Sequence, residues 1–178
     1  FWICLQLKTI ADIGIIGLPN AGKSSLLSFI TSAKPKIANY KFTTLNPNLG
    51  VFRYDDRELT LADIPGLIEN AHKGVGLGIK FLKHIERCNT LLHLIDVNED
   101  DIIKSYKQVR KELGKYSKKL LNKDEIIVFN KIDLINEDKL NSKKREFTSK
   151  YKKDILLLST LNKKLIKNIK SKLINYVS

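Results

Sequence analysis

The sequence contains no methionine and only two cysteines. A complete gene product begins with methionine unless the residue is removed, so we expect a piece of a longer protein that begins just ahead of its first strand. Cys4 and Cys88 are isolated and lack the spacing of metal ligands. We therefore expect two thiols in a reducing cytoplasm and no thiolate metal site.

Long apolar runs are also missing. No run approaches the ~20 residues that a membrane-spanning helix needs, so we expect no membrane span. Residues 1–8 are apolar but have neither a basic leader nor a small-residue cleavage site, so they are not predicted to be a signal peptide. We expect residues 1–8 to be the remnant of a linker or preceding domain, and residues 9–178 to form one domain with a sizeable core.

Acidic residues are scarce in the second part of the chain. The sequence is 43% hydrophobic and 29% charged, which is typical of a globular protein, and its net charge is +13. Residues 104–178 hold 21 of the 32 basic residues but only 8 of the 19 acidic ones. A basic surface attracts polyanions such as RNA. The alternative is a compositional bias, because lysine is a common solvated residue and the chain is also rich in isoleucine and asparagine.

Strand-like and helix-like segments alternate along the chain. Short runs rich in isoleucine, leucine and valine predict six strands, near 10–16, 49–54, 58–63, 91–96, 125–130 and 155–159. Amphipathic segments predict helices near 22–32, 77–88, 101–121, 137–151 and 162–176. This order predicts an α/β fold with a mostly parallel six-stranded sheet, helices on both faces and ligands at the carboxyl ends of the strands. The short link at 54–57 predicts a hairpin, and hence one antiparallel strand.

Residues 17–24, Gly-Leu-Pro-Asn-Ala-Gly-Lys-Ser, match the phosphate-binding pattern G-x-x-x-x-G-K-[ST] at every fixed position. A predicted strand precedes them and a predicted helix follows, which favours a phosphate loop over a chance glycine turn. The loop N–H groups would cradle phosphates, Lys23 would reach the β- and γ-phosphates, and the Ser24 hydroxyl would hold Mg²⁺. The predicted contacts are Gly17, Leu18, Pro19, Asn20, Ala21, Gly22, Lys23 and Ser24.

Two further segments are predicted to complete a Mg²⁺-linked switch. Asp63 ends a predicted strand and can hold Mg²⁺, while the Gly66 N–H can approach the γ-phosphate; alone, Asp-x-Pro-Gly would be a plain turn. A threonine after the first helix can join the Mg²⁺ shell when the γ-phosphate is present. Thr43 and Thr44 leave that choice open, although Thr44 is favoured, and ordinary strand chemistry is the alternative. The predicted contacts are Phe42, Thr43, Thr44, Leu45, Asn46, Asp63, Ile64, Pro65 and Gly66, with Ser24, Thr44 and Asp63 as metal ligands.

A third group of residues is predicted to select the base. The Asp133 carboxylate only accepts hydrogen bonds, so it suits the guanine N1–H and 2-amino donors, which adenine lacks. The Asn130 amide can serve another side of the base, and the Lys131 stem can cover the ring. A loop at 159–161 would bring an N–H to the guanine O6, although Ser-Thr before a helix is also ordinary capping chemistry. The predicted contacts are Asn130, Lys131, Ile132, Asp133, Ser159, Thr160 and Leu161.

Hydrolysis of GTP needs an oriented water and neutralised charge on the leaving γ-phosphoryl group. Leu67 occupies the position where many GTPases have a water-orienting glutamine, so slow intrinsic turnover is expected. His72 and His84 are expected on the surface rather than as catalytic bases. The predicted catalytic residues are Lys23, Asn20, Thr44 and Gly66.

Together these residues resemble the guanine-nucleotide-binding domain of the Obg family of bacterial GTPases. The counterparts are the phosphate loop and the segments 42–50, 63–69 and 76–87, and the resemblance extends over nearly the whole chain from about Leu7. Thr160 and Asn70 stand where the family usually has alanine and glycine. The family's glycine-rich N-terminal domain has no counterpart in this sequence.

The resemblance implies a P-loop NTPase of the Ras-like G-domain type, acting as a Mg²⁺-dependent GTPase switch in assembly of the large ribosomal subunit. It implies the large subunit or its RNA as partner. With GTP and GDP as the ligands that Asp133 favours, we expect a monomer in the cytoplasm. In similar GTPases that contain Pro-Asn-x-Gly-Lys-Ser, the asparagine helps to hold K⁺ near the phosphates. We therefore expect K⁺ to stimulate hydrolysis through Asn20; the alternative is that Asn20 only stabilises the loop.

The second hypothesis for the function is a nucleotide-gated RNA-binding or stress-signalling module in which hydrolysis is incidental. Asp133 argues against the third, an ATPase or kinase.

Overall fold

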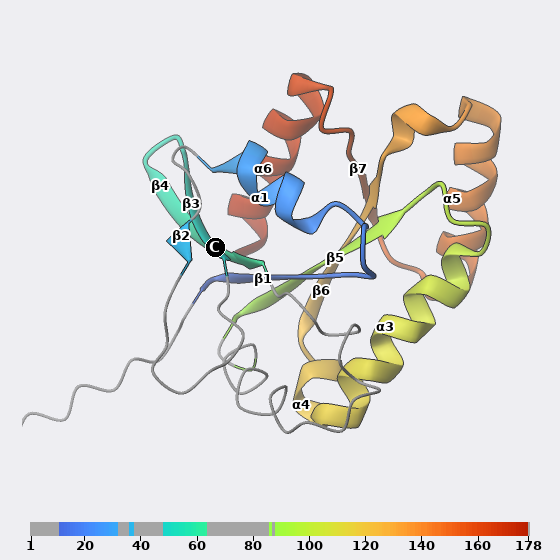
Figure 1. The fold of residues 1–178 in the computed structure, drawn as a ribbon, viewed down its shortest axis with the longest axis horizontal. Coiled ribbons are helices and arrows are strands. Elements are labelled where there is room, and N and C mark those ends of the chain that lie inside the picture. Colours follow the sequence, from blue (N-terminus) through green and yellow to red (C-terminus); the bar gives the residue numbers. More distant parts are fainter. Residues whose placement is uncertain (1–10, 32–35, 38–47, 64–85, 87, 178) are drawn as a thin grey trace, which may run out of the picture.

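The computed structural model describes residues 11–31, 36–37, 48–63, 86 and 88–177. Within them, seven strands form one sheet in the order β2-β3-β4-β1-β5-β6-β7 (Figure 1). The six predicted strands are all present, and the seventh, β2, was not predicted. The strands are β1 Ile13–Ile16, β2 Lys36–Ile37, β3 Asn48–Tyr54, β4 Arg57–Asp63, β5 Thr90–Asp96, β6 Asp124–Asn130 and β7 Ile155–Leu157.

The sheet is mostly parallel, as predicted. Strands β4, β1, β5, β6 and β7 run parallel to one another, whereas β3 pairs antiparallel with β4 and β2 antiparallel with β3. Tyr54 pairs with Arg57 across the tip of the β3–β4 hairpin, which confirms the predicted hairpin. Two residues are enough for the turn because Asp55 takes the left-handed conformation, with φ of +52°.

Helices cover both faces of the sheet (Figure 1). One face packs on α1 (Lys23–Ile30) and α6 (Lys163–Val177), and the other on α3 (Ile102–Tyr116) and α5 (Glu137–Tyr151). Helix α6 buries one apolar face, as expected of an amphipathic helix, through Ile166, Ile169, Leu173 and Ile174, while Leu165 is half-buried. Every residue of the central strand β1 is buried, as expected for a parallel strand covered on two sides. Among the described residues, no helix has the length and hydropathy to cross a membrane.

The prediction of a single helix over 101–121 is wrong at its C-terminal end. Helix α3 stops at Tyr116, and a short helix α4 (Lys118–Leu121) follows. Ser117 is extended, with φ of −160° and ψ of 129°, and its hydroxyl accepts a hydrogen bond from the Lys119 N–H at 3.2 Å. Serine suits this break because its side chain satisfies one of the first N–H groups of the next helix. The helix predicted at 77–88 falls outside the described ranges, apart from residues 86 and 88.

A buried polar cluster under α3 ties several elements together. Glu125, at the start of β6, accepts hydrogen bonds from His93 Nδ1 at 2.9 Å, from the Tyr106 hydroxyl at 3.0 Å and from Lys153, and Arg110 lies 3.6 Å away. Burial alone would raise the pKa of Glu125, but the hydrogen bonds from His93 and Lys153 and the charge of Arg110 outweigh it and lower the pKa to about 2. Burial lowers the pKa of His93.

The cluster predicts that the fold loses stability in acid in two stages. Unfolded His93 takes up a proton near pH 6.5 while the folded, buried ring stays neutral, so the free energy of unfolding should fall from pH 7 to pH 5, by up to about 1.4 kcal/mol per pH unit. The Glu125 contribution is lost only below its unfolded pKa, as the pH falls from about 4.5 towards 2. Urea unfolding between pH 5 and 8 measures the first stage.

The variant His93→Gln isolates that first stage, because glutamine can still donate to Glu125 but does not titrate. Its stability should decline less than that of the wild type between pH 7 and pH 5. Equal declines in the two proteins would show that His93 is not the group that takes up the proton on unfolding.

Candidate functional site

The loop between β1 and α1 has a backbone that only small or turn-forming residues adopt. Gly17 and Gly22 have φ of +153° and +94°, and Asn20 has φ of +63°. A Cβ on Gly17 would lie 2.5 Å from the Leu94 carbonyl oxygen, and one on Gly22 would lie 2.3 Å from Asn130 Nδ2. Backbone conformation and close packing therefore both require glycine at these two fixed positions of the motif.

Lys23, the first residue of α1, folds back over this loop. Its Nζ donates hydrogen bonds to the Gly17 carbonyl at 3.1 Å and to the Leu18 carbonyl at 3.0 Å. The ammonium group therefore sits against the loop backbone, at the N-terminal end of a helix, where the partial positive charge of the helix also favours an anion. This placement suits the predicted phosphate contact, which stays a prediction.

Ser24 and Asp63 come together although they lie on different elements. The Ser24 hydroxyl donates to Asp63 Oδ2 at 2.5 Å, and Asp63, the last residue of β4, is 1% exposed. Its other oxygen, Oδ1, is buried and has no hydrogen-bond partner among the described residues. A buried carboxylate oxygen without a partner is costly, and hydroxyl and carboxylate oxygens are the ligands that Mg²⁺ prefers. These two side chains therefore fit a magnesium ion.

The remaining switch predictions fall on parts of the chain that the structure does not describe. Thr44, the third predicted metal ligand, is among them, as are Leu67, His72, His84 and residues 1–8. The predicted contacts outside the described residues are Phe42, Thr43, Thr44, Leu45, Asn46, Ile64, Pro65 and Gly66.

Asn130, at the carboxyl end of β6, connects the predicted base segment to the phosphate loop. Its Nδ2 donates to the Ala21 carbonyl at 2.8 Å, and the side chain is buried. The Asn130 Oδ1 is buried with no partner in the described part of the chain, so the amide keeps an acceptor for a ligand. Lys131 then turns the chain with φ of +62° into a short 3₁₀ helix, Ile132–Leu134, which presents Asp133 on the surface.

The loop after β7 lies beside this 3₁₀ helix. Ile132 N–H donates to the Leu158 carbonyl at 3.3 Å, which holds the two segments together. Asp133, Ser159 and Leu161 border one open depression of about 650 Å³, and Leu161 is 80% exposed there. The structure therefore brings together the two segments that were predicted to contact the base.

The structure decides one of the alternatives for residues 159–161. The N-terminus of α6 is capped by Asn162, whose Oδ1 accepts hydrogen bonds from the Lys164 and Leu165 N–H groups at 3.0 and 3.3 Å. Ser159 instead accepts from the Leu161 N–H at 3.3 Å, within the loop itself. Ser159 and Thr160 are thus not the helix cap, and the loop keeps its own conformation ahead of it.

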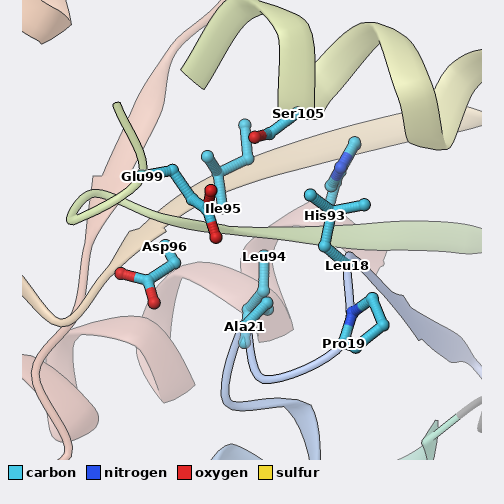
Figure 2. Close-up of a pocket in the computed structure, with 9 residues that line it drawn as sticks. All are labelled: Leu18, Pro19, Ala21, His93, Leu94, Ile95, Asp96, Glu99 and Ser105. Carbon is cyan, nitrogen blue, oxygen red and sulfur yellow. The ribbon is translucent and has the colours of Figure 1, made fainter. Parts of the chain in front are cut away.

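Asp96 is a polar residue of the site that the sequence analysis missed. It ends β5 next to the phosphate loop, and its Oδ2 accepts a hydrogen bond from Lys131 Nζ at 2.6 Å. The signal was present, since Asp96 follows a buried apolar strand just as Asp63 does. Figure 2 shows Asp96 and Glu99 across a small cavity from Pro19 and Ala21. That cavity, about 10 Å³, holds at most one water and is not itself a ligand site.

Comparison with known proteins agrees with this geometry. The family model described as "50S ribosome-binding GTPase" matches residues 12–131. The chain is 65% identical to GTPase Obg of Pelagibacter ubique, over 99% of this chain and 54% of that protein. It is 56% identical to GTPase Obg of Ehrlichia chaffeensis, over 99% of this chain and 51% of that protein. The chain thus spans about half the length of the curated relatives it matches.

Solved structures support the fold. The G domain of the FeoB iron transporter from T. maritima superposes with a TM-score of 0.66 at 20% identity, covering 93% of this chain and 98% of that one. A variant of Aquifex aeolicus Era bound to GDP and AlF4⁻ gives 0.66 at 24% identity, covering 94% and 56%. The predicted Ras-like P-loop fold is confirmed. The chain belongs to the family of 50S ribosome-binding GTPases, and the resemblance to the Obg family that its motifs carry is confirmed.

Proposed function

We propose that this domain binds GTP and hydrolyses it to GDP and phosphate with Mg²⁺, as a molecular switch. One observation carries the proposal: Asp133, Ser159 and Leu161 border a single depression, and Asn130 joins that region to the phosphate loop. A phosphate site and a base site therefore lie at one edge of the sheet, at the carboxyl ends of its parallel strands, where α/β proteins bind ligands. The family membership supports the same activity.

The residues of the proposed site have distinct roles. The loop backbone and Lys23 stabilise negative charge on the β- and γ-phosphates, while Ser24 and Asp63 would hold the metal. Bound Mg²⁺ supplies further neutralisation of charge on those phosphate oxygens. Thr44 and Gly66 complete the proposed site from segments outside the described residues. Leu67, and not a glutamine, directly follows Gly66 in the sequence, so intrinsic turnover is slow.

The base is selected by hydrogen-bond donors. Asp133 accepts from the guanine N1–H and 2-amino groups, the loop at 159–161 offers an N–H to the O6, and the Lys131 stem covers one ring face. Adenine provides neither donor to Asp133, so the carboxylate would lose its water contacts without gaining partners. GTP and GDP are therefore the proposed ligands, rather than ATP.

Replacement of Asp133 tests the base assignment. In Asp133→Ala the affinity for GDP and GTP should fall by about a hundredfold or more, because two hydrogen bonds to a charged acceptor contribute roughly 1.5–3 kcal/mol each. Weak binding of ATP should not change. Isothermal titration calorimetry measures both. Asp56→Ala is the matched control, because Asp56 is an equally charged, exposed residue in the β3–β4 turn. Unchanged GDP affinity in Asp133→Ala would contradict the assignment.

For the whole protein we propose a role in assembly of the large ribosomal subunit, with the subunit or its RNA as partner. The description of the family and the excess of 21 basic over 8 acidic residues in 104–178 support it. We propose that residues 9–178 form the GTP-binding domain and that the protein acts as a monomer in the cytoplasm.

The second candidate function is that of a nucleotide-gated RNA-binding or stress-signalling module, supported by the same basic residues. Salt-dependent binding of ribosomal RNA to this domain without any change in turnover would favour the second candidate.

We also propose that K⁺ stimulates hydrolysis through Asn20, which lies exposed in the phosphate loop. Turnover at equal ionic strength should be at least about tenfold faster in K⁺ than in Na⁺, a difference of about 1.4 kcal/mol in the barrier. Asn20→Gly should abolish that preference, since glycine tolerates the φ of +63° but removes the side-chain oxygen. Equal wild-type turnover in the two salts would contradict the proposal, and a preference that survives in Asn20→Gly would exclude Asn20 as the ligand.

A further inference from the structure

We propose that Asp96 is a positioning residue, which fixes the side chain of Lys131 as one wall of the base site before nucleotide binds. This inference rests on the proposed function. Asp96 pairs with Asn130 across the β5–β6 ladder, so Lys131 is the first residue beyond the paired strands. Asp96 Oδ2 lies 2.6 Å from Lys131 Nζ, with side-chain exposures of 13% and 33%. The ammonium group is thus held at the carboxyl end of the neighbouring strand.

The Asp96 carboxylate is itself held in place independently of Lys131. Its Oδ1 accepts the Asn98 N–H at 2.9 Å, which closes a turn of the Asx type. Lys143, a buried lysine of α5, holds this turn in place. Its Nζ donates hydrogen bonds to the Val97 carbonyl at 2.9 Å and to the Glu99 carbonyl. The Val97 N–H donates to the Asn130 carbonyl at 3.1 Å. The Asp96 carboxylate is therefore a fixed hydrogen-bond acceptor for the Lys131 ammonium group.

The backbone of Lys131 is fixed as well. The residues on either side are tied down, Asn130 by its bond to the Ala21 carbonyl at 2.8 Å and Ile132 by its bond to the Leu158 carbonyl at 3.3 Å. Lys131 between them has φ of +62°, which is uncommon for lysine. Its backbone and its ammonium group are thus both fixed, and the next two residues, Ile132 and Asp133, border the depression.

The ion pair does more for orientation than for stability. A partly exposed ion pair contributes little to the free energy of folding. A free lysine side chain, in contrast, has much conformational freedom to lose when a ligand packs against it, and pre-ordering reduces that loss. The effect should be the same for every ligand that carries the guanosine moiety, because the stem contacts the base and not the phosphates.

If Asp96 acted through its charge on the phosphates, its removal would have the opposite effect on nucleotide affinity. Asp96 lies across a small cavity from Pro19 and Ala21 of the phosphate loop (Figure 2). If its charge mainly repelled the phosphates, then removing the charge would strengthen binding, and more for GTP than for GDP. Comparing guanosine, GDP and GTP therefore separates the two roles.

The test is a double-mutant cycle on nucleotide affinity. Asp96→Asn keeps an oxygen for the Asn98 N–H but removes the charge that holds Lys131, and we expect the dissociation constants of guanosine, GDP and GTP to rise by a common factor of about tenfold. Lys131→Met keeps an apolar stem without the ammonium group, so Asp96→Asn should change affinity less than twofold in that background. The thermal midpoint without nucleotide should stay within a few degrees for each variant.

The matched control is Glu58→Gln, which breaks the Arg53 Nε–Glu58 Oε2 pair, also 2.6 Å long, on the exposed β3–β4 hairpin. It should leave affinity unchanged. Unchanged affinity in Asp96→Asn, an equal loss in the Lys131→Met background, or a gain that favours GTP would each overturn the role of Asp96 while leaving the proposed function intact. Failure of the wild type to bind guanine nucleotides would overturn both.

Discussion

The site depends on one buried hydrogen bond, from Asn130 Nδ2 to the Ala21 carbonyl. It joins residues 109 positions apart in the sequence and directly connects the phosphate loop to the segment that carries Asp133. Gly22 makes room for it, since a Cβ there would lie 2.3 Å from the same nitrogen. Leaving the carbonyl or the amide without its partner in this buried position would cost about 1–3 kcal/mol. The bond therefore sets the distance between the phosphate and base regions.

The parallel sheet explains why the other polar groups gather around that bond. Strands β4, β5 and β6 end at Asp63, Asp96 and Asn130, and all three point their carboxyl ends to the same edge. Their apolar residues are buried between two layers of helices, which fixes the strands rigidly. Each strand thus delivers one polar side chain to the edge, where Ser24 and Lys131 meet Asp63 and Asp96. The sheet and the helices packed on its two faces together position these groups.

The sequence predicted the features that depend on local patterns. Six strands, the hairpin and the position of the phosphate loop follow from apolar runs, turn length and fixed glycines. Strand β2 was missed because two residues carry no periodicity. The break at Ser117 was missed because the nearest glycine, Gly114, lies inside α3 and does not mark its end. The pairing of Asp96 with Lys131 could not be predicted, because contacts between residues that lie far apart in sequence are set by the tertiary fold. The roles of Thr44 and Gly66 stay predictions.

The central claim is that the edge of the sheet forms a guanine-nucleotide site. Calorimetric titration of the purified domain with GTP, GDP and ATP, in the presence of Mg²⁺, tests it most directly. We predict that GTP and GDP bind and that ATP binds at least about a hundredfold more weakly, since only guanine offers donors to Asp133. ATP binding as tight as GTP binding, or tighter, would contradict the claim.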